Sequence, residues 1–243
     1  MKIFYMKIKS SSAYREIIVN LVIIFVLMTV LAFSYAGGTL KVFNSNKGTK
    51  AIYQGNTSSN NVALMINVYW GDEFISPLLE IIEEKNIKCT FFIGGVWASV
   101  NEDLINEIIA TNCEIGNHGY LHKSQDKLNQ QESYDEINKT HNLVKSLTGV
   151  EMKLFAPPSG AYSDKTVDIA KELGYKTIMW TKDTVDWRDQ NEELIYSRAI
   201  KNAHGGDLIL MHPTGATVKA FSRIIDYFIQ KNFNLTTVSE TLI

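Results

Sequence analysis

Two histidines and one carboxylate are the residues of this chain best suited to bind a metal ion. His118 and His122 are separated by three residues, so a single turn of helix would point both imidazoles in the same direction. Asp72 follows a different apolar stretch and would add a carboxylate oxygen. Two imidazoles and one carboxylate leave a coordination position open, which is typical of catalytic zinc sites. We therefore predict that Asp72, His118 and His122 hold a divalent metal ion, expected to be Zn²⁺.

Further polar residues follow other apolar stretches, where they could take part in proton transfer. Asp183 and Asp186 come after the stretch at 176–180, and His212 comes after the stretch at 207–211. A histidine held by a carboxylate is a common general acid. We expect Asp186 to orient His212, and His212 to protonate a leaving amine.

Tryptophan side chains stand near the same positions. Trp70 and Trp187 follow predicted strands and could form an apolar wall on which a sugar ring stacks, whereas Trp180 lies inside a predicted strand and is expected to pack in the core.

The elements that must position these residues alternate between short apolar stretches and helical patterns. We predict strands at 62–66, 89–93, 113–116, 154–156, 176–180, 207–211 and 235–238, and helices at 76–85, 102–110, 131–147, 164–173, 192–201 and 218–231. Ser163 is a predicted N-cap and Gly149 a predicted C-cap. This alternation predicts an α/β fold with a parallel sheet and helices outside it. About seven such units could close into a distorted (β/α)7-type barrel, with its site at the carboxyl ends of the strands.

The N-terminal residues have a different character. Basic residues from Lys2 to Arg15 precede an almost uncharged run from Ile17 to Ala36, which predicts that residues 1–36 are a signal-anchor or a cleaved signal peptide. Residues 37–61 are rich in Gly, Ser, Asn, Lys and Thr and predict a tether, and residues 62–243 form the predicted domain. We expect an extracytoplasmic protein, either membrane-anchored or secreted, and a monomer.

Charge and cysteine content exclude some functions. The 24 Lys and Arg nearly balance the 26 Asp and Glu, so no large basic field is available to bind nucleic acid. The two cysteines, Cys89 and Cys113, lie in apolar stretches. We expect two buried thiols, and a disulfide between neighbouring strands stays an alternative.

Taken in order, these motifs make the region from about Asn61 to Ile243 resemble the polysaccharide deacetylase family, or NodB-homology domain, in particular its sporulation-associated members. The family carries Thr-Phe-Asp-Asp-Gly or a longer Asp-Val-x-Trp-Gly-Asp/Asn-Glu, followed by His-x-x-x-His, Arg-x-Pro-x-Gly, Asp-x-x-Asp-Trp and Leu-x-His. Residues 118–122, 183–187 and 210–212 match the second, fourth and fifth motifs, and Asp72 stands at the carboxylate of the longer first motif. The resemblance implies a distorted (β/α) barrel, a metal that is usually zinc, and an N-acetylated, peptidoglycan-like glycan as the partner. We expect the glycan to contact Tyr120, Pro157, Pro158 and Leu210 as well as the two tryptophans.

Two positions depart from the family pattern. Asn67 stands where the family has its general-base Asp, and Ala156 stands where it has the Arg that orients this base. A carboxamide cannot take a proton from metal-bound water near neutral pH. Losing both members of one ion pair is coherent, because an Arg left without its partner would be an uncompensated charge. Asp183 and Glu73 are candidate substitutes for the base.

Two functions are consistent with this pattern. The first is a metal-dependent hydrolase of carbon-nitrogen bonds that removes N-acetyl groups from cell-wall glycan, with weakened or modified catalysis. The second is an inactive glycan-binding or scaffold protein. Asn67 and Ala156 favour the second, whereas His212 and Asp186, with the predicted metal site, favour the first. Other enzymes common on α/β folds lack support, because no Gly-rich phosphate loop follows the first strand.

Overall fold

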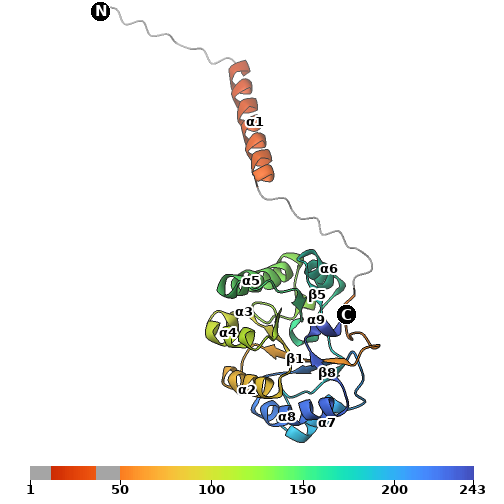
Figure 1. Ribbon diagram of the computed structural model, residues 1–243. Helices are drawn as coiled ribbons and strands as arrows, with labels where there is room; N and C mark the ends of the chain where they lie inside the picture. Colours follow the sequence, from red (N-terminus) through yellow and green to blue (C-terminus); the bar gives the residue numbers. More distant parts are fainter. Residues whose placement is uncertain (1–11, 37–49) are drawn as a thin grey trace, which may run out of the picture. The chain divides into compact units, whose positions relative to one another are not determined.

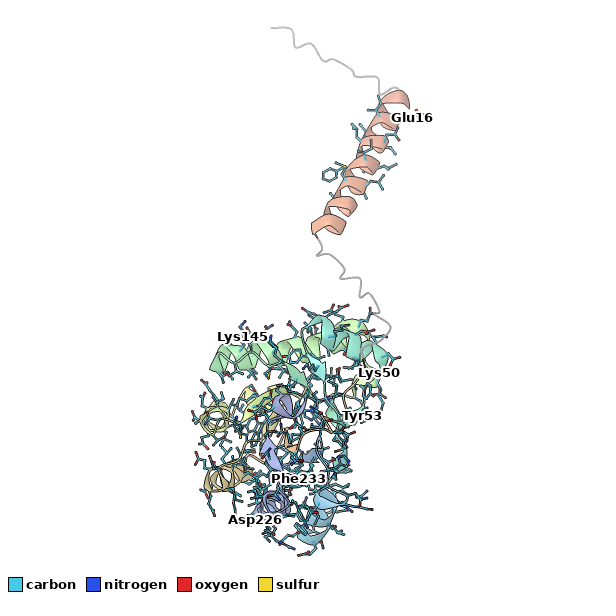
Figure 2. All side chains as sticks on the ribbon, turned by 45° about the vertical axis from the view of Figure 1, so that its right-hand side comes forward. Glu16, Lys50, Tyr53, Lys145, Asp226 and Phe233 are labelled. Atoms are coloured by element: carbon cyan, nitrogen blue, oxygen red, sulfur yellow. The ribbon has the colours of Figure 1, made fainter. Side chains whose placement is uncertain are left out.

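A computed structural model describes residues 12–36 and 50–243, and these fall into two units that are described separately here. The first unit contains one helix, α1 (Ser12–Ala36). The described side chains from Ile17 to Met28 are exposed (Figure 2). Within the part of the chain that the structure describes, no helix meets the length and apolarity needed to cross a membrane. The expectation of a signal or anchor at 1–36 is not otherwise tested, and residues 1–11 lie outside the described residues.

The second unit is built on one parallel sheet. Its strands are β1 (Asn61–Val68), β2 (Thr90–Ile93), β3 (Glu114–Asn117), β4 (Leu154–Phe155), β5 (Lys176–Thr177), β6 (Lys182–Asp183), β7 (Leu208–Met211) and β8 (Asn234–Thr236). They are ordered β5-β4-β3-β2-β1-β7-β6, and β8 pairs with β1 beside this path. Every described pairing is parallel, and β1 pairs with β2 from Met65 to Val68 and with β7 from Ala63 to Ile66. The α/β barrel expected from the sequence is confirmed as a curled sheet.

The barrel is open at one seam, which the sequence pattern did not reveal. β5 and β6 follow each other in the chain but lie at opposite ends of the sheet order. The predicted strand at 176–180 is too long. β5 ends at Thr177, and Ile178 makes only an isolated bridge to Ile52. β6 itself was not predicted.

Helices surround the sheet (Figure 1). The main ones are α2 (Ile75–Lys85), α4 (Glu102–Ala110), α5 (Gln130–Thr148), α6 (Asp164–Glu172), α7 (Glu192–Ile200) and α8 (Gly215–Gln230). They contact one another in the order α7, α8, α2, α4, α5, α6, which follows the strand order from β6 to β5. Shorter elements are η1 (Asp72–Phe74), α3 (Gly95–Ala98), η2 (Gln125–Lys127), η3 (Pro158–Gly160) and α9 (Val238–Thr241). The predicted caps are confirmed: Ser163 accepts from the Thr166 backbone N–H, and Gly149 ends α5 at φ 74°.

A cluster of buried apolar side chains fills the barrel: Ala63, Met65, Phe92, Leu154, Ala156, Ile178, Leu208 and Val238. Ala63, Met65 and Asn67 alternate with Leu64, Ile66 and Val68 along β1, as the two-residue period of a strand requires. Ala63 and Met65 belong to the cluster, and Asn67 follows them at the carboxyl end of the strand. The same alternation therefore places Asn67 on the inner face of the barrel.

Residues 50–61 belong to this domain, so the predicted tether is too long. The Ile52 N–H donates to the carbonyl of Thr177 (2.8 Å), and the Asn56 N–H donates to that of Thr241 (2.8 Å). Ile52 also packs against the core cluster. Polar composition alone suggested a linker, but a chain that closes the amino-terminal end of a barrel needs few apolar residues. The remainder of the predicted tether, 37–49, lies outside the described residues.

Cys89 and Cys113 are both buried and free, which confirms the expectation of two thiols. They precede β2 and β3, and their neighbours Thr90 and Glu114 are paired in register.

Candidate active site

His118 is an almost fully buried polar residue at the mouth of the barrel. It directly follows β3, and its backbone N–H continues the sheet by donating to the Ile93 carbonyl (2.9 Å). Its ring Nδ1 lies 2.8 Å from the carbonyl oxygen of Ala156. Because a carbonyl can only accept, Nδ1 carries the proton and Nε2 keeps its lone pair. The imidazole is thus held in the tautomer that presents Nε2 as an acceptor.

The local environment keeps both histidines of the pair neutral. Burial, assisted by the neighbouring His122, lowers the pKa of His118 to about 3. Burial also lowers the pKa of His122, and His212 adds to this effect. The centroids of the His118 and His122 rings are 5.0 Å apart. The sequence prediction that these two imidazoles lie together is therefore correct, although the segment is a loop rather than a helical turn.

Two side chains fix the loop that carries the pair. The Asn117 side-chain oxygen accepts from the Gly119 N–H (2.9 Å). The buried carboxylate of Glu136, on α5, accepts from the N–H groups of Tyr120 (3.0 Å) and Leu121 (2.8 Å). A charged acceptor for two adjacent backbone donors holds the loop firmly.

His212 and Asp186 form a hydrogen-bonded pair, as the sequence predicted. His212 Nδ1 lies 2.8 Å from one oxygen of Asp186. The other oxygen accepts from the His212 backbone N–H (2.6 Å) and from the Thr217 hydroxyl (2.6 Å). Asp186 is fully buried, so these three bonds replace the water that its carboxylate loses. The His212 ring lies parallel to Trp70, with 6.2 Å between the centroids.

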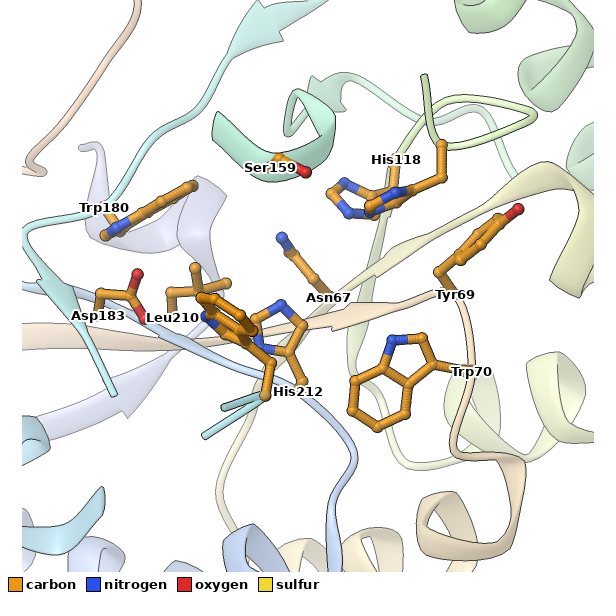
Figure 3. Close-up of a pocket in the computed structure, with 11 residues that line it drawn as sticks. Asn67, Tyr69, Trp70, His118, Ser159, Trp180, Asp183, Leu210 and His212 are labelled. Carbon is orange, nitrogen blue, oxygen red and sulfur yellow. The ribbon is translucent and has the colours of Figure 1, made fainter. Parts of the chain in front are cut away.

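These residues surround a cavity of about 310 Å³ (Figure 3). Its eleven described lining residues are Asn67, Tyr69, Trp70, His118, His122, Ser159, Trp180, Asp183, Trp187, Leu210 and His212. In Figure 3 the Asn67 carboxamide lies between the His118, His212 and Ser159 side chains. Most of the lining is aromatic or apolar, and the expected positions of Trp70, Trp187, Asp183 and Leu210 at the cavity agree with the structure.

Asn67 and Ala156, the two departures from the family motifs, lie where a general base and its partner would be needed. Asn67 is 4% exposed, and its Oδ1 is buried without a hydrogen-bond partner among the described residues. Ala156 is fully buried and packs in the core cluster. Its carbonyl holds His118, but its methyl group can offer no charge to the cavity.

Asp72 is not close to the two histidines, so the predicted three-residue metal site is not found. β1 ends at Val68, and the chain then crosses Pro213, where a Cβ on Gly71 would lie 2.2 Å from the Pro213 carbonyl oxygen. Asp72 begins η1 beyond this crossing, is exposed, and does not line the cavity. Glu73 is likewise exposed and outside the cavity. The residue next to Asn67, where the shorter family motif has its second Asp, is Val68, which is apolar and fully buried.

Other contacts expected from the sequence are also wrong. Tyr120, Pro157 and Pro158 do not line the cavity. Pro158 instead lies against Gly119, and the Tyr120 ring lies against Gly95, so both support the loop backbone.

Three lining residues differ from the expectation of the sequence. Tyr69 and Ser159 were not predicted, and Trp180 lines the cavity instead of packing only in the core. Tyr69 could have been found, because it stands two residues after Asn67 on the same face of the strand, and its ring stacks on His122 at 4.6 Å.

Backbone strain is concentrated beside the cavity. Seven described residues other than glycine have positive φ; four are Asn, which tolerates this conformation, and the others are His122 (55°), Ser159 (56°) and Val185 (54°). His122 and Ser159 line the cavity, and Val185 directly precedes Asp186. A β-branched residue in the left-handed region costs about 1–3 kcal/mol. The Asp183 side chain compensates in part by accepting from the Val185 N–H (2.8 Å).

Comparison with known proteins agrees with this geometry. The family model described as "Polysaccharide deacetylase" matches residues 54–178. The chain belongs to the polysaccharide deacetylase family. A Bacillus subtilis relative, "Uncharacterized protein YlxY", is 37% identical over 191 residues, which cover 79% of this chain and 60% of that protein. A "Peptidoglycan-N-acetylglucosamine deacetylase" of Bacillus cereus is 31% identical over 179 residues, covering 70% of this chain and 82% of that protein.

Among solved structures, "WT BA3943, a CE4 family pseudoenzyme" from Bacillus anthracis matches with a TM-score of 0.79 and 34% identity, covering 81% of this chain and 70% of that one. A mutant of the same protein is described as having "restored enzymatic activity". The chain spans about three fifths of the length of the first curated relatives that it matches.

The deacetylases of this family depend on a metal ion, but the residues present here do not fit such a site. His118 and His122 offer two neutral imidazoles, yet neither Asp72 nor Val68 supplies a carboxylate beside them. Across the described residues, no group of three or more His, Cys, Asp or Glu side chains is placed to hold a metal ion. The polysaccharide deacetylase fold is thus retained without the ligand set that the sequence predicted.

Proposed function

We propose that this chain binds amino-sugar glycan of the peptidoglycan class in the cavity at the mouth of the barrel and does not hydrolyse it efficiently. The observation that carries the proposal is the carboxamide of Asn67 at the base position, next to a histidine pair that no third His, Cys, Asp or Glu completes as a metal site among the described residues. From the sequence alone, weakened catalysis was slightly favoured over a binding role. The position of Asp72 outside the cavity reverses that preference.

The cavity walls support glycan binding. Trp70 is 42% exposed and Trp187 is 53% exposed, and both line the cavity. Exposed aromatic faces beside polar groups suit the alternating apolar faces and hydroxyl edges of sugars. The relatives named as peptidoglycan deacetylases support the same class of ligand.

Slow hydrolysis is the second candidate, because the His212–Asp186 pair is intact and faces the cavity. This pair could protonate a leaving amine. With a carboxamide at the base position and no complete metal site, however, only Asp183 among the cavity residues could activate the attacking water, and loss of a base alone typically costs about 10²–10⁴-fold in rate.

The test measures binding and acetate release on the same preparations. We expect the protein to co-sediment with insoluble peptidoglycan and to release no acetate from it, with or without added zinc. Trp187→Ala should weaken co-sedimentation, whereas Tyr53→Ala, which removes an exposed aromatic side chain outside the cavity, should not. Acetate release that depends on His212 would favour the second candidate, and absence of co-sedimentation would refute the first.

We further propose that the domain acts outside the cytoplasm, either attached to the membrane or released from it. The support is the order of the N-terminal sequence, in which basic residues precede a long apolar run.

A further inference from the structure

The inner part of the cavity presents hydrogen-bond acceptors and few donors. His118 Nδ1 donates to the Ala156 carbonyl (2.8 Å), and His212 Nδ1 donates to Asp186 (2.8 Å). In the neutral ring each leaves Nε2 as a bare acceptor. Asn67 Oδ1 is a third acceptor, buried without a partner, and a half-turn of the carboxamide would present it to the cavity.

The charge of the cavity points in the same direction. Asp183 is the only carboxylate among the eleven described lining residues, and none of the eleven is Lys or Arg. The Asp186 carboxylate lies behind this lining, paired with His212. Arg188 follows the lining residue Trp187 and lies 5.9 Å from the centroid of its ring, but its guanidinium is held by both oxygens of Asp189 (2.8 and 2.9 Å). Among the described lining residues, a ligand therefore meets one carboxylate, that of Asp183, and no Lys or Arg.

Aromatic faces add to this preference. Tyr69, Trp70, Trp180 and Trp187 all line the cavity. Such faces attract cations, since the ring carries negative charge density above its plane.

An ammonium group matches these three features better than an acetamido group. The ammonium brings three N–H donors and a positive charge. The acetamido group brings one N–H donor, and its carbonyl would face the lone pairs of His118 and His212. The donors that could serve this carbonyl are few: the hydroxyl of the exposed Ser159 and, in the orientation that buries Oδ1, the amide nitrogen of Asn67.

We propose that the cavity recognises the free amino group of a de-N-acetylated amino sugar, as its ammonium ion. This inference rests on the proposed function, which is binding without hydrolysis. It places the protein after a reaction of the N-deacetylation class, because only such a reaction turns the acetamido group of a hexosamine into a free amine. The protein would then report where cell-wall glycan has been deacetylated.

The experiment compares two oligosaccharides of equal length, one of glucosamine and one of N-acetylglucosamine, by calorimetry with the full chain. The measurement is made at a pH below that at which the sugar amine loses its proton, so that the ammonium form predominates. We expect the glucosamine oligomer to bind about tenfold tighter, the size of effect that hydrogen bonds to a charged group produce.

Three variants locate the preference. Asp183→Asn removes the carboxylate of the lining and should reduce the preference to near zero. Asp103→Asn makes the same charge change at an exposed position of α4, outside the cavity, and should leave it intact. Asn67→Asp adds a charge at the buried acceptor and should tighten glucosamine binding.

The outcomes separate this inference from the proposed function. Equal or tighter binding of the N-acetylated oligomer would overturn the ammonium inference and leave glycan binding intact. Binding of neither oligomer would overturn both. Because Asn67→Asp should raise affinity, a loss of folding in Asp183→Asn would not leave the question open.

Discussion

Removal of the Asp186 carboxylate tests why the His212–Asp186 pair is present in a protein that has Asn67 at the family's base position. Asp186 accepts hydrogen bonds from the His212 N–H, the His212 ring and the Thr217 hydroxyl, and it is fully buried. In Asp186→Ala, the His212 N–H loses this acceptor, and the fully buried Thr217 hydroxyl keeps only the Thr214 hydroxyl, 2.8 Å away, as a partner. An unsatisfied buried donor costs about 1–3 kcal/mol, so the free energy of unfolding should fall by at least this amount. That is a large part of the 5–15 kcal/mol or so that stabilises a typical domain.

Urea unfolding followed by circular dichroism measures this loss. Thr217→Val provides the matched control, since it removes one donor and leaves Asp186 with its two bonds to His212. The double variant should be more stable than the sum of the single changes predicts, because the bond between the Thr217 hydroxyl and Asp186 is lost only once in it. A loss below about 1 kcal/mol in Asp186→Ala, with additive effects in the cycle, would refute the reasoning. The pair would then have no structural role, and its presence would argue for chemistry.

Three other predictions follow from the site. Asn67→Asp with Ala156→Arg restores the base and its partner but not a third metal ligand. Acetate release from an N-acetylglucosamine oligomer should therefore stay near the level of the unmodified chain. Strong release by this double variant would show that the ligand set is complete. Calorimetry should show only weak zinc binding, and EDTA should not shift the midpoint of urea unfolding. Tight zinc binding that is lost in His122→Ala would contradict the absence of a three-ligand cluster among the described residues. The pKa of His118 is lowered to about 3 in the folded protein, so the unfolded chain takes up a proton first as pH falls. This residue should therefore lower the free energy of unfolding by about 1.4 kcal/mol per pH unit, from its unfolded pKa of ~6.5 down to the folded value. His118→Gln should flatten the dependence of stability on pH in that window.

The pattern of apolar residues was enough to predict most of the fold. Strand and helix positions such as those of β1 and α4 are close to the predicted ones, because each is a long or clearly bounded pattern. β6 could not be predicted, since it has two residues, Lys182 and Asp183, and neither is apolar. Its strand pairing depends on β7 beside it, which no local pattern reveals.

Positions at the site were predictable where a side chain comes directly after a strand, as His118 and His212 do. Asp72 was placed wrongly because it comes four residues after the end of β1, and the direction of a loop depends on contacts such as that of Gly71 with Pro213. The motif spacing placed Asp72 at a site, but it contains no information on the path of the chain between Tyr69 and Asp72.

The residues with positive φ also bear on how selection acts on this chain. At Asn86, Asn112, Asn202 and Asn232 the left-handed turn carries an amino acid that tolerates it. His122, Ser159 and Val185 carry side chains that do not, although a single substitution to Asn or Gly would relieve each of them. A domain that had lost all use for its cavity would be free to accept these substitutions by drift and gain stability. The strain at these three positions is therefore expected to serve the shape of the cavity, as it would in a surface that binds a ligand.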